Sequence, residues 1–283
     1  MARQGSLTRT LLDAVLDLVH AQLALGHPDF EAEGARFVRD PSLPRIYDAN
    51  FVWDVRAATP GALERLLARV EVEYAGLGHR AFRLDPRTPP LVAARLALDG
   101  YERSDSLVLV LEGEPVGGPR AGTAPGGPAP CEIRPVEAEA DWGALVAMKR
   151  EDFAEAFRRR EPGKPVDLAI ADGLARANRG KCPPERYWLA LADGTPCGFL
   201  ASWEGTEGVG QVEDLFVTPR LRRRGIARAL LLGGIADARR RGAGAIAIVA
   251  DPTDTPMRLY AALGFHPLAL CPLYRKDIGD RSR

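Results

Sequence analysis

The sequence has few of the residues that build metal centres and disulfide frameworks. Only four cysteines and four histidines occur among its 283 residues. The cysteines, Cys131, Cys182, Cys197 and Cys271, are widely spaced and form no Cys-x-x-Cys pair. This spacing indicates neither a zinc site nor a set of disulfides. We therefore expect reduced thiols and no metal.

The sequence also lacks net charge and long apolar runs. Lys and Arg together number 38, as do Asp and Glu, so no global field favours nucleic acid or an acidic membrane surface. No apolar run approaches the length that spans a bilayer. The apolar residues between Leu7 and Val19 follow a helical period interrupted by Asp13 and Asp17, unlike the core of a signal peptide. We expect a cytoplasmic protein with no nucleic-acid or membrane partner.

A stretch rich in glycine and proline divides the chain. Residues 113–130 contain six glycines and five prolines, which can neither propagate a helix nor donate regularly to a sheet. We interpret this stretch as a flexible linker. The predicted units are residues 1–112 on its N-terminal side and residues 131–283 on its C-terminal side.

A basic turn between a predicted strand and a predicted helix is the most informative part of the sequence. The strand covers residues 211–217 and the helix covers residues 226–240, with three consecutive arginines (residues 222–224) and Gly225 between them. Backbone N–H groups at a helix start lack intrahelical partners, and the helix dipole adds positive charge there. Guanidinium groups suit phosphate oxygens, and glycine lets the backbone approach a ligand. The turn therefore predicts a phosphate site.

Two motifs carry a family resemblance. Arg222, Gly225 and Ala227 form the pattern Arg-x-x-Gly-x-Ala, and residues 259–265 read Leu-Tyr-Ala-Ala-Leu-Gly-Phe. Both resemble motifs of the GNAT superfamily of acyl-CoA-dependent N-acetyltransferases, Arg/Gln-x-x-Gly-x-Gly/Ala and Leu-Tyr-x-x-x-Gly-Phe. The resemblance covers residues 131–276, about half of the chain. It implies that acetyl-CoA is the acyl donor.

The fold class implied by the resemblance is α/β (α+β), a mixed and mostly antiparallel sheet with helices on both faces. Hydrophobic periods in the C-terminal unit predict the order strand, helix, helix, three strands, helix, strand, helix, strand. The N-terminal unit repeats part of this pattern, with strands near residues 52–56, 81–86 and 106–111 and a helix over residues 60–74. We interpret it as a degenerate, partial GNAT-like module in a tandem arrangement. Its strand–helix turn is uncharged, so only the C-terminal unit is expected to bind the cofactor.

Two residues are the expected catalytic groups. The resemblance places Glu213 at the acceptor cleft as general base, where burial against apolar groups would raise its pKa. Asp214 is the alternate base, and water is a possible intermediary. Side-chain alternation would place Glu213 on one face of the strand and Asp214 on the other. Tyr260 matches the family tyrosine near the CoA sulfur and is the expected acid.

The expected cofactor contacts follow from the same match. The backbone of Phe216 and Val217 would hold the pantetheine arm as an added strand does. Thr253 stands where many family members have an asparagine that bonds the pantetheine, which puts that contact in doubt. The pyrophosphate and its surroundings are assigned to Arg222, Arg223, Arg224, Gly225, Ile226, Ala227 and Arg228.

The expected function is transfer of an acetyl group from acetyl-CoA to a primary amine of a small molecule or peptide in a ternary complex. Two alternatives remain: a longer acyl or aminoacyl donor, and a non-enzymatic CoA-binding interaction module. The acceptor is not identified by the sequence, although five aromatic residues and the segment 151–164 are candidates for its cleft. The aromatic residues are Trp142, Phe153, Phe157, Trp188 and Trp203. A monomer or a homodimer is expected.

Overall fold

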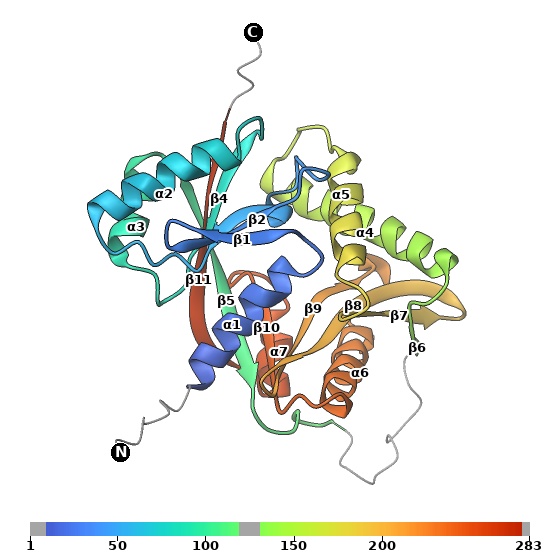
Figure 1. Cartoon of the computed structure of the whole chain (residues 1–283). Coiled ribbons are helices and arrows are strands. Elements are labelled where there is room, and N and C mark those ends of the chain that lie inside the picture. The colour runs from blue at the N-terminus through green and yellow to red at the C-terminus, as the bar shows by residue number, and fades with distance from the viewer. Residues whose placement is uncertain (1–9, 119–130, 279–283) are drawn as a thin grey trace, which may run out of the picture.

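One sheet of eleven strands organises the part of the chain that the computed structural model describes, residues 10–118 and 131–278 (Figure 1). The strands are β1 (Asp29–Ala32), β2 (Ala35–Arg39), β3 (Asn50–Trp53), β4 (His79–Arg83), β5 (Glu102–Leu111), β6 (Glu132–Pro135), β7 (Arg186–Ala192), β8 (Thr195–Thr206), β9 (Val209–Val217), β10 (Ala245–Ala250) and β11 (His266–Asp277). The order across the sheet is β1-β2-β3-β4-β11-β5-β10-β9-β8-β7-β6. Only β3–β4 and β9–β10 pair in parallel, which confirms a mixed, mostly antiparallel sheet.

Helices cover both faces of the sheet, as expected. They are α1 (Leu11–Ala24), α2 (Pro60–Glu73), α3 (Pro90–Leu98), α4 (Glu139–Arg160), α5 (Leu168–Gly180), α6 (Ile226–Arg240) and α7 (Met257–Leu263), with short 3-10 turns η1 (Tyr47–Ala49) and η2 (Pro219–Leu221). Consecutive residues of β5 point to opposite faces of the sheet. Leu109 packs in the cluster of α6 and α7, whereas Val108 packs against α1. No helix of the described ranges is long and apolar enough to cross a membrane.

Local sequence signals explain many of the element boundaries. Thr59 accepts a hydrogen bond from the backbone N–H of Ala62 and Pro60 opens α2, so the helix starts at a capped first turn. Gly264 ends α7 with a φ of 98°, a conformation that glycine adopts without a steric penalty. The predicted element order of the C-terminal half is confirmed from β6 through β11. The sequence reasoning missed the β1–β2 hairpin.

The two halves repeat one another and exchange strands. The order β3-α2-β4-α3-β5 in the N-terminal half recurs as β9-α6-β10-α7-β11 in the C-terminal half. Across the centre of the sheet the strands read β3-β4-β11-β5-β10-β9, so the last strand of each half lies inside the other half. In Figure 1, β11 runs between β4 and β5. Asp54 lies just after β3, and Asp214 lies in the second half of β9. Both residues have positive φ, 48° and 59°.

The division into units 1–112 and 131–283 stays a prediction. Residues 119–130 of the expected linker lie outside the described residues. The strand exchange shows that a boundary in the sequence at this linker does not separate the sheet into two parts, because β5 pairs with both β10 and β11.

Candidate active site

The turn between β9 and α6 has the backbone geometry of an anion site. Arg223 and Gly225 both have positive φ, 61° and 85°, and Gly225 is the residue before the first turn of α6. Alternating left- and right-handed residues turn successive N–H groups toward one side and form a concave anion site. Within the described residues, the N–H groups of Arg223, Arg224 and Gly225 have no backbone acceptor. These groups and the first turn of α6 leave a set of donors available to a phosphate.

The arginine side chains of this turn have different roles. Arg222 forms a bidentate pair with Glu155 of α4, at 2.8 and 2.6 Å, and its Nε donates to the Val217 carbonyl at 2.9 Å. Arg228 donates to the carbonyl of Val116 at 2.6 Å and so ties residues 113–118 to α6. Two of the seven expected phosphate-site residues therefore have internal partners.

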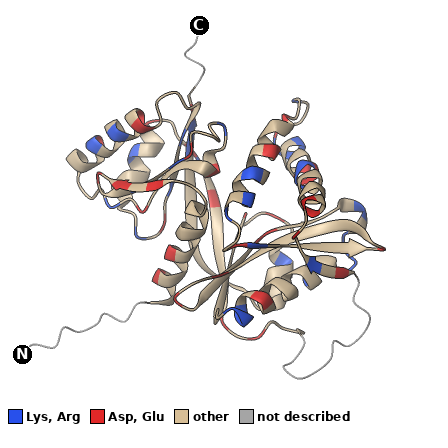
Figure 2. Cartoon of the chain, turned by 45° about the vertical axis from the view of Figure 1, so that its right-hand side comes forward, with Lys and Arg blue, Asp and Glu red and all other residues tan. Residues whose placement is uncertain are grey.

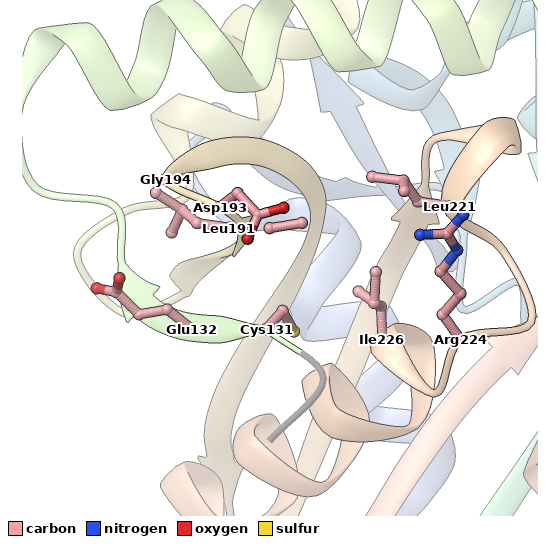
Figure 3. A pocket seen from close by; sticks show the side chains of 9 residues that line it. Cys131, Glu132, Leu191, Asp193, Gly194, Leu221, Arg224 and Ile226 are labelled. Carbon is pink, nitrogen blue, oxygen red and sulfur yellow. The ribbon is translucent and has the colours of Figure 1, made fainter. Parts of the chain in front are cut away.

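The remaining arginines are exposed. Arg223 and Arg224 form no hydrogen bond or ion pair with the rest of the described chain. Arg224 lines a hollow of about 360 Å³ beside the turn, with Leu221 on its own side and Asp193 on the opposite side (Figure 3). Ile226 is buried in the core, so that only its backbone N–H is available to a ligand. Figure 2 shows basic and acidic residues interspersed along the ribbon.

The strands beside this turn separate and leave an unpaired edge. β9 and β10 pair in parallel only over Val209–Gln211 and Ala245–Ala247. Beyond these residues, β9 continues to Val217 and remains paired with β8 on its other edge. The backbone of Phe216 and Val217 therefore faces a gap between the strands, where an extended ligand can add as a strand does.

A β-bulge changes the faces of β9. The pairing with β8 shifts between Phe199↔Phe216 and Ala201↔Glu213, and Asp214 takes the left-handed conformation. Consequently Glu213 and Asp214 both point to the α4 side of the sheet, and Phe216 does as well. Val212, Leu215 and Val217 pack with the α6 side. The predicted alternation, with Glu213 and Asp214 on opposite faces, was wrong because the extra residue reverses the pattern.

Glu213 is held by three donors. Gln22 of α1 donates to its Oε1, Gln211 donates to its Oε2 at 3.0 Å, and Lys181 Nζ lies 3.7 Å from Oε1. The Glu213 side chain is 20% exposed, whereas Lys181 is buried. The expected apolar surroundings of Glu213 are therefore absent among the described residues, and polar groups surround it instead.

A second buried carboxyl lies behind Glu213. Glu185 accepts a hydrogen bond from Gln22 at 2.8 Å and is 1% exposed. Burial, and then the charge of Glu213, raise the pKa of Glu185 well above its ordinary value. Burial alone would lower the pKa of Lys181, but the charges of Glu213 and Glu185 outweigh it and raise that pKa. Lys181 therefore remains charged at neutral pH and lies beside Glu213.

Asp214 is also fully engaged. Its Oδ2 accepts hydrogen bonds from Tyr187 at 2.7 Å and from Asn178 at 3.0 Å, and it forms an ion pair with Lys149 of α4. Burial alone would raise the pKa of Asp214, but Lys149 and Tyr187 outweigh it, so the pKa is lowered. Asp214 is therefore a stable carboxylate that joins β9 to the helices above it.

Both bulge carboxylates open onto a cavity of about 1060 Å³. Helices α4 and α5 form one side, with Phe153 and Phe157 among the lining residues, and the N-terminal half contributes Tyr47 and Arg103. The cavity is large enough for a small organic molecule of ordinary size. Of the five aromatic candidates for an acceptor cleft, Trp142, Trp188 and Trp203 instead pack with the core clusters.

Thr253 and Tyr260 follow β10, the strand that borders the gap opposite β9. Tyr260 is buried in the cluster of α6 and α7, against Phe265 with ring centroids 6.2 Å apart. Burial, and then the charge of Asp254, raise the pKa of Tyr260, which keeps its hydroxyl protonated at neutral pH. Thr253 is exposed, and its hydroxyl donates to Asp251 at 2.6 Å, so the side chain is turned toward its own loop.

Sequence reasoning missed the residues that hold the two bulge carboxylates. Gln22, Lys149 and Lys181 hold the two bulge carboxylates, yet none belongs to a motif or stands near residue 213 in the sequence. Gln22 and Glu213 are 191 positions apart. A lysine on a predicted helix is ordinarily a solvated surface residue, and no pattern distinguishes Lys149 from its neighbours.

The described chain has a GNAT-like α/β architecture, with unpaired backbone N–H groups in the turn before α6. Residues 146–265 match the model of the acetyltransferase (GNAT) family. This match lies within the C-terminal half of the chain. A mycothiol acetyltransferase from Thermobispora bispora is 31% identical over 160 residues, which cover 54% of this chain and 52% of that protein. The chain spans about half the length of the curated relatives it matches.

Solved structures show the same fold over most of the chain. A GCN5-related N-acetyltransferase from Kribbella flavida superposes with a TM-score of 0.64 at 18% identity, covering 95% of this chain and 97% of that one. A tandem GNAT protein from the clavulanic acid biosynthesis pathway has a TM-score of 0.56 at 16% identity, covering 87% and 78%. Both similarities extend beyond the C-terminal domain, in agreement with the internal repeat.

Proposed function

We propose that this protein transfers an acetyl group from acetyl-CoA to a primary amine. The observation that carries the proposal is that three features follow one another along β9 and the turn after it. They are the cavity at Glu213 and Asp214, the strand gap at Phe216 and Val217, and the unpaired N–H groups of the turn. Free N–H groups at residues 223–225 and the exposed Arg223 and Arg224 fit a pyrophosphate. The unpaired edge at Phe216 and Val217 fits an extended pantetheine arm. The cavity that contains Glu213 and Asp214 fits the acceptor.

The reaction requires little covalent chemistry from the protein. The amine must lose a proton, and the departing thiolate must receive one. Placing amine and thioester together supplies much of the rate, and general acids and bases typically add about 10²–10⁴-fold. Tyr260 is protonated at neutral pH and suits the acid role, while Ile226, Ala227 and Gly225 contribute backbone N–H groups to the phosphates. Thr253 has no direct role in this arrangement.

The acceptor is proposed to be a small polar amine. The cavity contains charged residues of both signs from both halves of the chain, including Asp48, Arg103, Lys149 and Asp251. Such a lining favours a ligand with several polar groups over an apolar one. The name of the curated relatives makes a mycothiol-related amine the first compound to test, and peptide amines the second.

The proposal is tested by calorimetric titration of acetyl-CoA into the wild type, Gly225→Ala and Gly225→Glu. Both variants carry the strain of a side chain at positive φ, but only the glutamate brings a negative charge to the phosphate turn. We expect the wild type to bind, the alanine variant to bind more weakly, and the glutamate variant to lose binding while remaining folded. A wild type that does not bind acetyl-CoA would refute the proposal.

Turnover then separates the alternatives. Release of CoA thiol is measured with a panel of amines, each with acetyl-CoA and with longer acyl-CoA donors. Preference for a longer donor would replace the acetyl assignment. Binding of acetyl-CoA without turnover of any amine in the panel would favour a non-enzymatic CoA-binding module.

A further inference from the structure

Two ion pairs join helix α4 to β9 and to the turn that follows it. Their α4 residues are six positions apart. Lys149 forms an ion pair with Asp214 at the bulge. Glu155 forms the bidentate pair with Arg222 of the phosphate turn. The stretch of β9 between these two ion pairs contains Phe216 and Val217, whose backbone borders the strand gap.

Asp152 lies midway along α4 between the two ion-paired residues, Lys149 and Glu155. Residues three apart on a helix are neighbours on one side, so Lys149, Asp152 and Glu155 form one stripe. Because both outer members of the stripe contact β9 or the turn that follows it, the middle member faces the same strand. The Asp152 side chain lines the cavity that also contains Glu213 and Asp214. Its position is therefore above the part of β9 where the thioester is proposed to lie.

The Asp152 carboxylate is free to react. Within the described ranges it forms no hydrogen bond and no ion pair. The other two candidate bases differ in this respect, since Glu213 and Asp214 each have three donors. Donors that stabilise a carboxylate oppose its protonation. Either group would have to weaken these contacts in order to accept a proton.

The charges around Asp152 place its protonation near neutral pH. Burial raises the pKa of Asp152 to about 6, and the charge of Asp214 contributes to the rise. Lys149 on α4 and Arg222 on the turn oppose it, while Glu155 adds to it. Further cations line the cavity, namely Lys181, Arg45, Arg103, Arg160 and Arg275. A base with this pKa is mostly ionised at pH 7 and still holds a proton better than an ordinary aspartate.

We propose that Asp152 is the catalytic base that removes a proton from the acceptor amine, an inference that rests on the proposed function. The amine enters as an ammonium ion, and Asp152 takes one proton from its nitrogen. The nitrogen lone pair attacks the thioester carbonyl carbon, so that the C–N bond forms. The C–S bond breaks with its electron pair on sulfur, which receives a proton from Tyr260. The nitrogen gives up a second proton, which restores Tyr260, and Asp152 releases its proton to water.

In this arrangement Glu213 is a positioning residue. It contacts Gln22, Gln211 and Lys181 at the edge of the cavity, and its carboxyl group orients the amine. This assignment differs from the sequence-based expectation that Glu213 itself takes the proton. The two assignments predict different pH profiles for the variants of each residue.

The test measures kcat, KM and the pH profile of kcat/KM by CoA thiol release, with an amine that the wild type acetylates. Asp152→Asn is compared with Glu213→Gln and with Glu151→Gln, an exposed α4 residue outside the cavity. We expect Asp152→Asn to lose about 100-fold or more in kcat, a typical effect of removing a general base, with acetyl-CoA affinity unchanged. Glu151→Gln should retain wild-type rates. Formate should partly restore the activity of Asp152→Ala.

The pH profile gives the sharper distinction. The carboxylate form of Asp152 is the active form, so wild-type kcat/KM should fall as pH drops below about 6. This acid limb should vanish in Asp152→Asn and persist in Glu213→Gln. Retention of kcat and of the acid limb in Asp152→Asn would overturn the inference but leave the acetyltransferase proposal intact. A wild type that binds no acetyl-CoA or acetylates no amine would overturn both.

Discussion

At the residue scale, burial and partners together set the pKa values of the carboxyl groups in and behind the cavity. Glu185 and Asp152 both have a raised pKa, whereas Asp214 has a lowered one although it too is buried. The difference is the partner: Asp214 has Lys149, Tyr187 and Asn178, while Asp152 has none in the described chain. The same side-chain type therefore serves as a fixed anchor at one position and as a titrating group at the other.

Asp152 should lower the stability of the protein at neutral pH. Its folded-state pKa is raised to about 6 from 3.8, so the unfolded chain ionises first, and stability falls as pH rises through this interval. Asp152→Asn removes this cost. We expect it to raise the free energy of unfolding at pH 7.5 by about 2–3 kcal/mol, and by roughly half as much at pH 5.

Urea unfolding at the two pH values measures this effect, with Glu151→Gln as the control. A variant that is more stable and less active would distinguish a catalytic role of Asp152 from a structural one. Equal stability of Asp152→Asn and the wild type at pH 7.5 would contradict the burial argument.

At the element scale, the periodic parts of the sequence predicted helices and strands well. Strands β7 and β10 and the helix α6 have the bounds expected from the sequence, because each is a short, strongly patterned segment. The bulge in β9 was not predictable from alternation, since one left-handed residue, Asp214, reverses the faces of all residues after it. The β1–β2 hairpin, with strands of four and five residues, was missed.

The ion pair between Lys149 and Asp214 is expected to hold α4 against the bulge of β9. Both side chains are largely buried, 8% and 19% exposed, so removing one charge leaves the other without its main partner. Lys149→Met should lower the free energy of unfolding by about 3 kcal/mol. The double variant Lys149→Met/Asp214→Asn should be less destabilised than the sum of the single changes.

A double-mutant cycle in urea measures this coupling. The matched control is the exposed pair of Arg150 and Asp172, which joins α4 to α5 and should contribute less than about 1 kcal/mol. Additive effects of Lys149→Met and Asp214→Asn would show that the buried pair does not couple the helix to the strand.

At the scale of the whole molecule, the exchange of β5 and β11 makes the two halves interdependent. A C-terminal fragment that begins at residue 131 lacks β5, which otherwise lies between β10 and β11. Without it, two neighbouring strands lose their ladder partner and the residues of β5 leave two core clusters. We expect fragment 131–283 to be insoluble or unfolded when produced alone.

Coexpression with fragment 1–118 should restore a soluble complex, because the linker is not required for the strand pairing. Solubility and circular dichroism of the fragments, alone and together, check this prediction. A folded, acetyl-CoA-binding fragment 131–283 would show that the C-terminal half is independent. A second experiment starts from the intact chain. A protease cleavage site is inserted into residues 119–130, and the two halves should remain associated after cleavage.

The sequence by itself determined the features that lie within a few consecutive residues. The basic turn between β9 and α6, the motif around Tyr260 and the order of elements are local, so they can be read from the spacing of neighbouring residues. The tertiary structure alone decided which side chains meet beside the cavity, such as Gln22 and Glu213, because the fold joins segments that are distant in the sequence. It also decided which carboxyl group is free to accept a proton, since burial and hydrogen-bond partners, and not residue type, set the protonation of an acid.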